Sequence, residues 1–225
     1  NTKKMIDEGI DLLMISPKDS EALRPVIDEA YDKGIPVIVL TRAVEGEKYT
    51  SYIGPNDYEI AKEAANKLAE SLDFKGDIIM LQGVISNATA QKRTEGFVQE
   101  ITKYKDINLI KVLPANYKRA DAAIMLASEI AEGLKFEGIF SQSDSMASGA
   151  RVALEKSGID PKTIKTIGID YIKDAQDAIR NKMQVGSFTY PTCGKEGANI
   201  ALKILNKESV PKKIEVKSKY IDKNN

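Results

Sequence analysis

Apolar runs of strand length alternate with amphipathic helical patterns along the first part of this chain. Residues 11–16 and 36–41 form two such runs, and neither shows the alternation of a half-exposed strand. The stretch between them repeats apolar positions at helical spacing: Ala22, Leu23, Val26, Ile27 and Ala30. Continuous apolar strands separated by helices indicate a parallel sheet that helices cover on both sides.

A second unit of the same kind follows a change of pattern between Arg42 and Asn56, where we place a crossing between domains. A helix with apolar positions from Ile60 to Leu72 comes next. Further strands are expected at 77–81, 108–113, 138–142, 164–169 and 185–189, with helices between the first four, and a last helix covers 194–205. The tail alternates at 214, 216, 218 and 220, which predicts one exposed or edge strand.

Residues 80–97 join a strand to a helix through a polar loop after Gly83. In an open α/β sheet such loops lie outside the carboxyl ends of the strands, where ligands bind, so Gln82, Asn87 and Arg93 are expected there. The alternative is an ordinary connection with a solvated arginine.

The amino-acid composition excludes several classes of partner and catalytic site. Lys plus Arg and Asp plus Glu are equal at 33 each, so no global charge favours nucleic acid or an anionic membrane. The 225 residues include no His, no Trp and a single Cys, Cys193, for which packing is the favoured role over reactivity. Imidazole catalysis, Cys/His metal sites and an intrachain disulfide are therefore excluded, and we expect no cofactor and no metal.

Polar residues follow the strands at their carboxyl ends, which is the ligand-binding side of such sheets. Arg, Asp, Ser, Thr and Tyr together suit a neutral polyhydroxylated molecule, because hydroxyls both donate and accept and an aromatic face covers the apolar side of a ring. Each residue also has a plain reading as a helix cap, a solvated charge or packing, so only their coincidence argues for a site. The set is Ser16, Asp19, Thr41, Arg42, Gln82 to Arg93, Asn116, Tyr117, Ser143, Asp144, Asp170 and Thr189.

Several motifs in this order resemble the ribose-binding protein family, the type I periplasmic sugar-binding proteins. They are residues 15–20 (ISPKDS), 34–37 (GIPV), Gln82-Gly83 with 93–97 (RTEGF), 143–149 (SDSMASG) and 167–170 (IGID). The resemblance covers nearly the whole chain, and the motifs are specific together although each is weak alone.

This resemblance implies two Rossmann-like lobes joined by three hinge crossings near Ile53, Thr189 and Lys213, with the sugar between the lobes. The amino-terminal lobe would span 1–53 plus 191–213, and the carboxy-terminal lobe 54–190 plus 214–225. The family often has Asp where Thr41 stands, Asn for Ser143 and Gln for Thr189, which leaves the particular sugar open. The positions that the resemblance assigns to the ligand are Ser16, Thr41, Arg42, Arg93, Tyr117, Ser143, Asp170 and Thr189.

Compared with the family, the chain opens at the end of a helix before Asp11, so a strand, a helix and a further strand, roughly fifty residues, are expected to be absent. The expectation is that 1–225 is an excerpt, or that another segment or chain completes the first sheet.

The leading function is a non-catalytic receptor for a monosaccharide, a pentose or a hexose, outside the cytoplasm. It would sit in the periplasm or on the cell surface as a lipoprotein, and its partner would be the permease of an ABC importer or a membrane sensor kinase, with no nucleic acid. One alternative is the effector-binding core of a LacI-type transcriptional regulator. A nucleotide-dependent enzyme is a third, although no phosphate-binding glycine motif follows a strand here.

Overall fold

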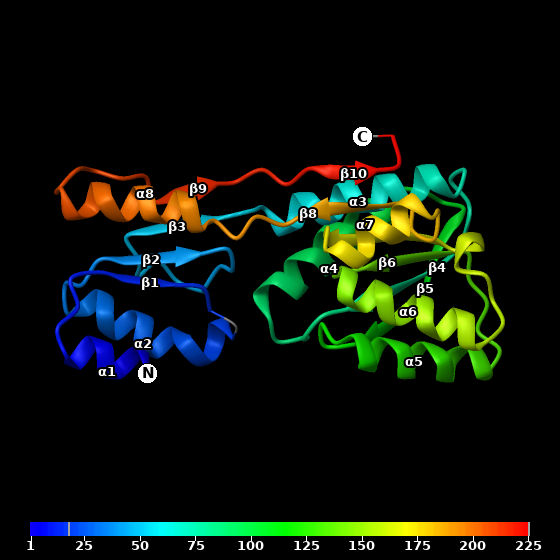
Figure 1. The fold of residues 1–225 in the computed structure, drawn as a ribbon, viewed down its shortest axis with the longest axis horizontal. Coiled ribbons are helices and arrows are strands. Elements are labelled where there is room, and N and C mark those ends of the chain that lie inside the picture. The colour runs from blue at the N-terminus through cyan, green and yellow to red at the C-terminus, as the bar shows by residue number, and fades with distance from the viewer. Residues whose placement is uncertain (18, 225) are drawn as a thin grey trace. The chain divides into compact units, whose positions relative to one another are not determined.

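The computed structural model describes residues 1–17 and 19–224, and it confirms the α/β class (Figure 1). Contacts divide the chain into two compact units. The first unit is 1–56, 87–89 and 191–217, and the second is 57–86, 90–190 and the residues from 218 onward. The lobe boundaries proposed from the sequence, after 53, 190 and 213, lie near these divisions; that the two units are the two lobes stays a proposal.

The first unit holds a four-stranded parallel sheet in the order β1-β2-β3-β9. Its helix α2 begins where Asp19 accepts a hydrogen bond from the backbone N–H of Ala22 at 3.0 Å, as an N-cap does. Lys18, in the motif 15–20, lies outside the described residues. The elements are α1 (Thr2–Asp7), β1 (Leu13–Ile15), α2 (Ser20–Asp32), β2 (Val37–Leu40), β3 (Ser51–Gly54), α8 (Gly194–Leu205) and β9 (Lys213–Glu215).

Strand β2 is buried on both faces, as its unbroken apolar run predicts. Val37 and Val39 pack with residues of α1 and α2, whereas Ile38 and Leu40 pack with Ile200 of α8 and its neighbours. In Figure 1 the helices α1 and α2 accordingly lie on one side of this sheet and α8 on the other.

The second unit holds a six-stranded sheet in the order β10-β8-β7-β6-β4-β5, parallel except for the antiparallel edge strand β10. Its strands are β4 (Gly76–Gln82), β5 (Ile107–Pro114), β6 (Gly138–Ser141), β7 (Lys165–Asp170), β8 (Gly186–Thr189) and β10 (Tyr220–Asp222). Its helices are α3 (Asp57–Ser71), α4 (Ala88–Ile101, whose first two residues group with the first unit), α5 (Arg119–Ala131), α6 (Asp144–Lys156) and α7 (Lys173–Arg180), with a 3-10 turn at Pro161–Thr163.

Two apolar cores lie on opposite faces of this sheet. Phe97 of α4 stacks on Phe140 of β6 with ring centroids 4.1 Å apart, in a core that α3 completes. On the other face Ile79 and Leu81 of β4 pack with Leu126 of α5 and with α6. Since neighbouring strands are parallel, the carboxyl ends of β4 to β8 share one edge of the sheet.

The tail differs from the prediction of one strand. Two three-residue strands form, and each is the last strand of a different sheet: β9 pairs parallel with β3, and β10 pairs antiparallel with β8. The edge position is therefore confirmed, and the single strand is wrong, because alternation is the same whichever sheet a residue joins. Helix α7 had no counterpart among the predicted helices.

Candidate functional site

Arg93, on the first half of α4, holds its charged group inside the second unit at 2% exposure. Its Nε donates to Asp57 Oδ1 at 2.9 Å, and its Nη1 donates to the backbone oxygen of Gln142. The ring of Tyr190 lies 4.5 Å from the guanidinium carbon, and the Tyr190 hydroxyl donates to Asp57 Oδ2 at 3.1 Å. Nη2 bonds no residue of the described chain, so part of the guanidinium remains available to a ligand.

The groups around Arg93 also keep its guanidinium charged. Burial, the largest single cause, would lower the pKa of Arg93, but the charges of Asp57, Tyr190, Tyr117 and Asp170 together outweigh burial, so the pKa is raised. Arg93 is therefore a permanent cation, and the phenol of Tyr117 and the carboxylate of Asp170 are near enough to act on it.

The end of β5 presents Tyr117 in a left-handed turn, with φ of 55° at Asn116 and 59° at Tyr117. The ring lies directly against Gly83, where an added Cβ would overlap it. Gly83 N in turn donates to Gln142 Oε1 at 3.0 Å. The glycine after β4 thus lets an aromatic face from β5 reach the neighbouring strand end.

Ser143 follows β6 and caps α6, because its Oγ accepts from Met146 N at 3.4 Å. Ser143 is 4% exposed and is the N-cap residue of α6. Asp144, for which a cap was the alternative, is instead the first residue of α6 and is fully buried in a hydrogen-bond network.

Asp170 and Thr189 lie opposite each other at the ends of β7 and β8. Asp170 has φ of 111°, which is unusual for a residue with a side chain. Thr189 is bound to the tail: its N donates to Lys219 O at 2.8 Å, and its Oγ1 accepts from Lys219 N at 2.9 Å. The hydroxyl oxygen of Thr189 therefore has a structural role.

In the first unit, Thr41 and Arg42 follow β2, and Ser16 follows β1. Thr41 has φ of 66°, and its hydroxyl donates to Thr192 O at 2.8 Å. Arg42 is half-buried, and Ser16 is exposed. Ligand contact by these three, as by the five in the second unit, stays a prediction.

Sequence reasoning missed Asp57, Gln142 and Tyr190, which hold Arg93 in place. Asp57 stands at the start of a helix, where an acidic residue is ordinary, and Arg93 is 36 residues away. Tyr190 is separated from Asp57 by 133 residues. No short sequence motif contains Asp57, Gln142 and Tyr190 together. The signal that could have identified them is that Asp57 begins a helix and that Gln142 and Tyr190 each follow a strand.

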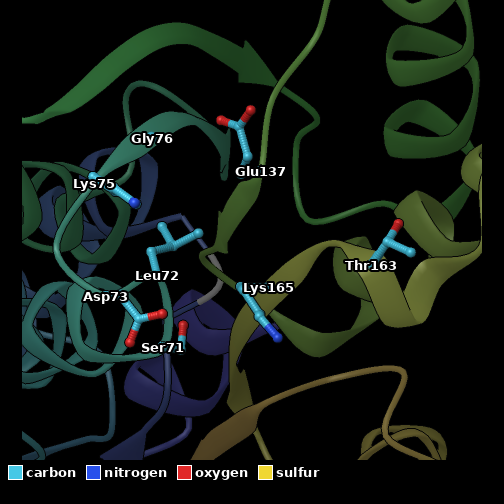
Figure 2. A pocket seen from close by; sticks show the side chains of 8 residues that line it. All are labelled: Ser71, Leu72, Asp73, Lys75, Gly76, Glu137, Thr163 and Lys165. Atoms are coloured by element: carbon cyan, nitrogen blue, oxygen red, sulfur yellow. The ribbon is translucent and has the colours of Figure 1, made fainter.

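Two surface hollows lie at the opposite, amino-terminal edge of the second sheet. The one in Figure 2, of about 470 Å³, lies where β4, β6 and β7 begin, with Lys75, Glu137 and Lys165 around it. The other, of about 460 Å³, is lined by Lys162, Lys182 and the tail, among others. Neither hollow is lined by any of the eight residues predicted to contact the ligand, so the candidate site is based on those eight residues.

Three further observations concern Cys193, metal ligands and helix length. Cys193 is 2% exposed, and burial raises the pKa of its thiol, which favours packing over reactivity. Within residues 1–17 and 19–224, no three His, Cys, Asp or Glu side chains gather as metal ligands. In the same part of the chain, none of the helices has the length and apolarity needed to cross a membrane.

A periplasmic binding protein domain is the class that this fold and edge define, and the model of that family matches residues 1–209. The chain belongs to this family.

Among similar proteins, the ribose import binding protein of Haemophilus influenzae is 30% identical over 98% of this chain and 75% of its own length. The xylitol-binding protein of Mycolicibacterium smegmatis is 29% identical over 81% of this chain, and the match spans only 52% of that protein. The fructose-binding periplasmic domain of a hybrid two-component system has 33% identity and a TM-score of 0.94, and the chain covers 75% of it.

Proposed function

We propose that this chain captures a neutral monosaccharide outside the cytoplasm, using the carboxyl edge of the second unit, and presents it to a membrane partner. The observation that carries the proposal is the Arg93 assembly: a buried guanidinium held by Asp57, Gln142 O and the Tyr190 ring, with Tyr117 and Asp170 close enough to act on its charge.

A cation, a carboxylate and a phenol at one edge match the needs of a sugar. The guanidinium donates to two hydroxyls at once, the carboxylate accepts from others, and an aromatic face covers the C–H side of the ring. Arg42, Thr41 and Ser16 of the first unit are proposed to add contacts of the same kind.

The partner is proposed to be either the permease of an ABC importer or a membrane sensor kinase. Import is supported by the similarity to ribose import binding proteins, and sensing by the similarity to a two-component fructose-binding domain. A lipid anchor stays a prediction. We infer that the chain binds without chemistry, because the proteins to which it is similar are binding proteins.

A thermal-shift panel of pentoses, hexoses and xylitol on the intact protein tests the proposal. A ligand that binds only the folded state raises the melting temperature, and stabilisation of about 2.7 kcal/mol is expected at a hundredfold excess over Kd. Charged sugar acids and sugar phosphates are the controls, for which we expect no shift. The absence of a shift with every neutral sugar would contradict the proposal, and NMR detection of a converted sugar would contradict the non-catalytic part.

A further inference from the structure

Asp144 ties three elements of the second unit together with one buried carboxylate. Oδ2 accepts from Ser187 Oγ of β8 at 2.6 Å and from the backbone N–H of Tyr171 at 2.7 Å. Oδ1 accepts from Gln184 Nε2 at 2.8 Å. The residue itself begins α6, so the carboxylate links α6, β8 and the turn after β7.

Strand β7 and Gln184 pack directly against the Asp144 carboxylate. A Cβ at Gly168 of β7 would overlap Asp144 Oδ1, so the strand passes in direct contact with the carboxylate. Gln184 cannot turn its amide freely, because its Oε1 accepts from Arg151 Nη1 at 2.7 Å while its Nε2 also bonds Gly186 O at 3.1 Å. The carboxylate therefore receives a donor of fixed orientation on Oδ1.

The backbone N–H that Asp144 holds belongs to Tyr171, which directly follows the candidate ligand residue Asp170 at the end of β7. Asp170 has φ of 111° and Tyr171 has φ of 53°, so two consecutive residues with side chains occupy left-handed backbone regions. Such conformations persist where surrounding bonds fix them, and Tyr171 N is fixed by Asp144 and, at 3.2 Å, by Ser187 Oγ.

We propose that Asp144 is a positioning residue for the sugar site: its ionised carboxylate holds Tyr171 N–H and so keeps Asp170 in the binding conformation, and protonation loosens that hold and weakens sugar binding. This inference rests on the proposed function, which it extends with a dependence on pH.

Protonation rearranges the bonds without a further reactant. The acid gains one O–H, Ser187 turns its hydroxyl to accept that proton, and the Tyr171 N–H is left with a weaker acceptor. Burial raises the pKa of Asp144 to about 7, with the bonds from Ser187, Gln184 and Tyr171 opposing this and the charge of Asp170 adding to it. The charged groups around it are Arg151 on α6, Asp170 at the end of β7 and Asp174 of α7, which pairs with Arg151. Arg119 of α5 acts on Arg151.

Calorimetric titration of the sugar found in the panel tests the inference on the intact protein. Between about pH 8.5 and about pH 5.5 we expect wild-type affinity to fall about tenfold. Asp144→Asn, which cannot ionise, should bind weakly at both pH values. Ser187→Ala removes a bond that favours the ionised form and should move the midpoint to higher pH, while Asp177→Asn on the exposed face of α7 should behave as wild type. Equal wild-type affinity at both pH values would overturn the inference.

NMR of the sugar-free protein tests the positioning directly and separates the two proposals. The Tyr171 amide resonance should titrate together with the Asp144 side-chain carbon, in wild type and in Asp177→Asn but not in Asp144→Asn. If the Tyr171 amide resonance does not change as Asp144 titrates, the inference is overturned even where sugar binds. If the Tyr171 resonance titrates with Asp144 but no sugar binds, the proposed function is contradicted instead.

Discussion

Arg93 is held by contacts within the second unit and is also proposed to bind the sugar. A buried guanidinium is tolerated only when it is paired and hydrogen-bonded, and Asp57, Gln142 O and the Tyr190 ring meet that need. The pairing uses Nε and Nη1, so the same rigid fork keeps donors for a hydroxyl-bearing ligand.

Replacing Arg93 with Ala should therefore affect both properties. We expect sugar affinity to fall by about 2–4 kcal/mol, because charge-assisted hydrogen bonds are lost. The free energy of unfolding should also fall, by about 3–5 kcal/mol, since Asp57 would stay buried without its partner. Calorimetry and urea denaturation measure the two losses, and Arg180→Ala, at an exposed ion pair of α7, should change neither. Wild-type affinity in the Arg93 variant would contradict the assignment of the sugar site to Arg93.

Asp170→Gly separates recognition from backbone strain. Glycine accepts φ of 111° without strain, so the free energy of unfolding should stay within about 1 kcal/mol of wild type while affinity falls by about 2–4 kcal/mol. Denaturation and calorimetry on the same preparation check this. A large loss of stability would mean that the Asp170 carboxylate holds the fold as well.

Positions after strands together with the family resemblance predicted Arg93, Tyr117 and Asp170 as ligand residues, because the carboxyl ends of parallel strands meet at one edge. The partners of Arg93 were missed for a physical reason: Asp57 and Tyr190 reach it through the tertiary fold, from far away in the sequence. The hydrogen bonds of Thr41 and Thr189 to backbone oxygens and amides were equally invisible, since hydroxyls leave no pattern in a sequence.

At the scale of elements, apolar runs of strand length predicted β2 and β6, because a strand buried on both faces must be apolar on both faces. The tail was harder. Its alternation is compatible with any edge, and only the separate pairing of Ile214 with Ile53 and of Ile221 with Ser187 divides it into two strands.

Helices α5 and α6 pack closely enough to predict a glycine requirement. A Cβ at Gly149 would overlap the backbone oxygen of Arg119 and lie 3.0 Å from Ala122 Cβ, whereas one at Gly194 would meet nothing within 4 Å. Gly149→Ala should therefore lower the free energy of unfolding by about 1–3 kcal/mol, and Gly194→Ala, the matched control, should not lower it. Urea denaturation of both variants measures the difference. Equal effects would show that α5 and α6 can move apart at little cost.

At the scale of the molecule, each unit has its own sheet with apolar cores on both faces. The carboxylates whose pKa values are shifted nevertheless change the free energy of unfolding in different directions as pH changes. Exposed ion pairs lower the pKa of Asp177 and of Glu29, so their contributions are present above the normal carboxylate range and are lost as pH falls through it. Asp144 acts in the opposite direction, because burial raises its pKa.

The sign for Asp144 follows from which state binds the proton first. Its pKa is about 7 in the folded protein and about 3.9 when unfolded, so between these values the folded state holds a proton that the unfolded state has lost. Acidification from about pH 7 to about pH 4 should therefore raise the free energy of unfolding, by up to about 4 kcal/mol from this group. In urea denaturation across this range, Asp144→Asn should lose the rise and Asp177→Asn should keep it. The same proton is expected to weaken sugar binding, so stability and affinity should change in opposite directions in wild type. A parallel fall of both on acidification would contradict the assignment of this proton to Asp144.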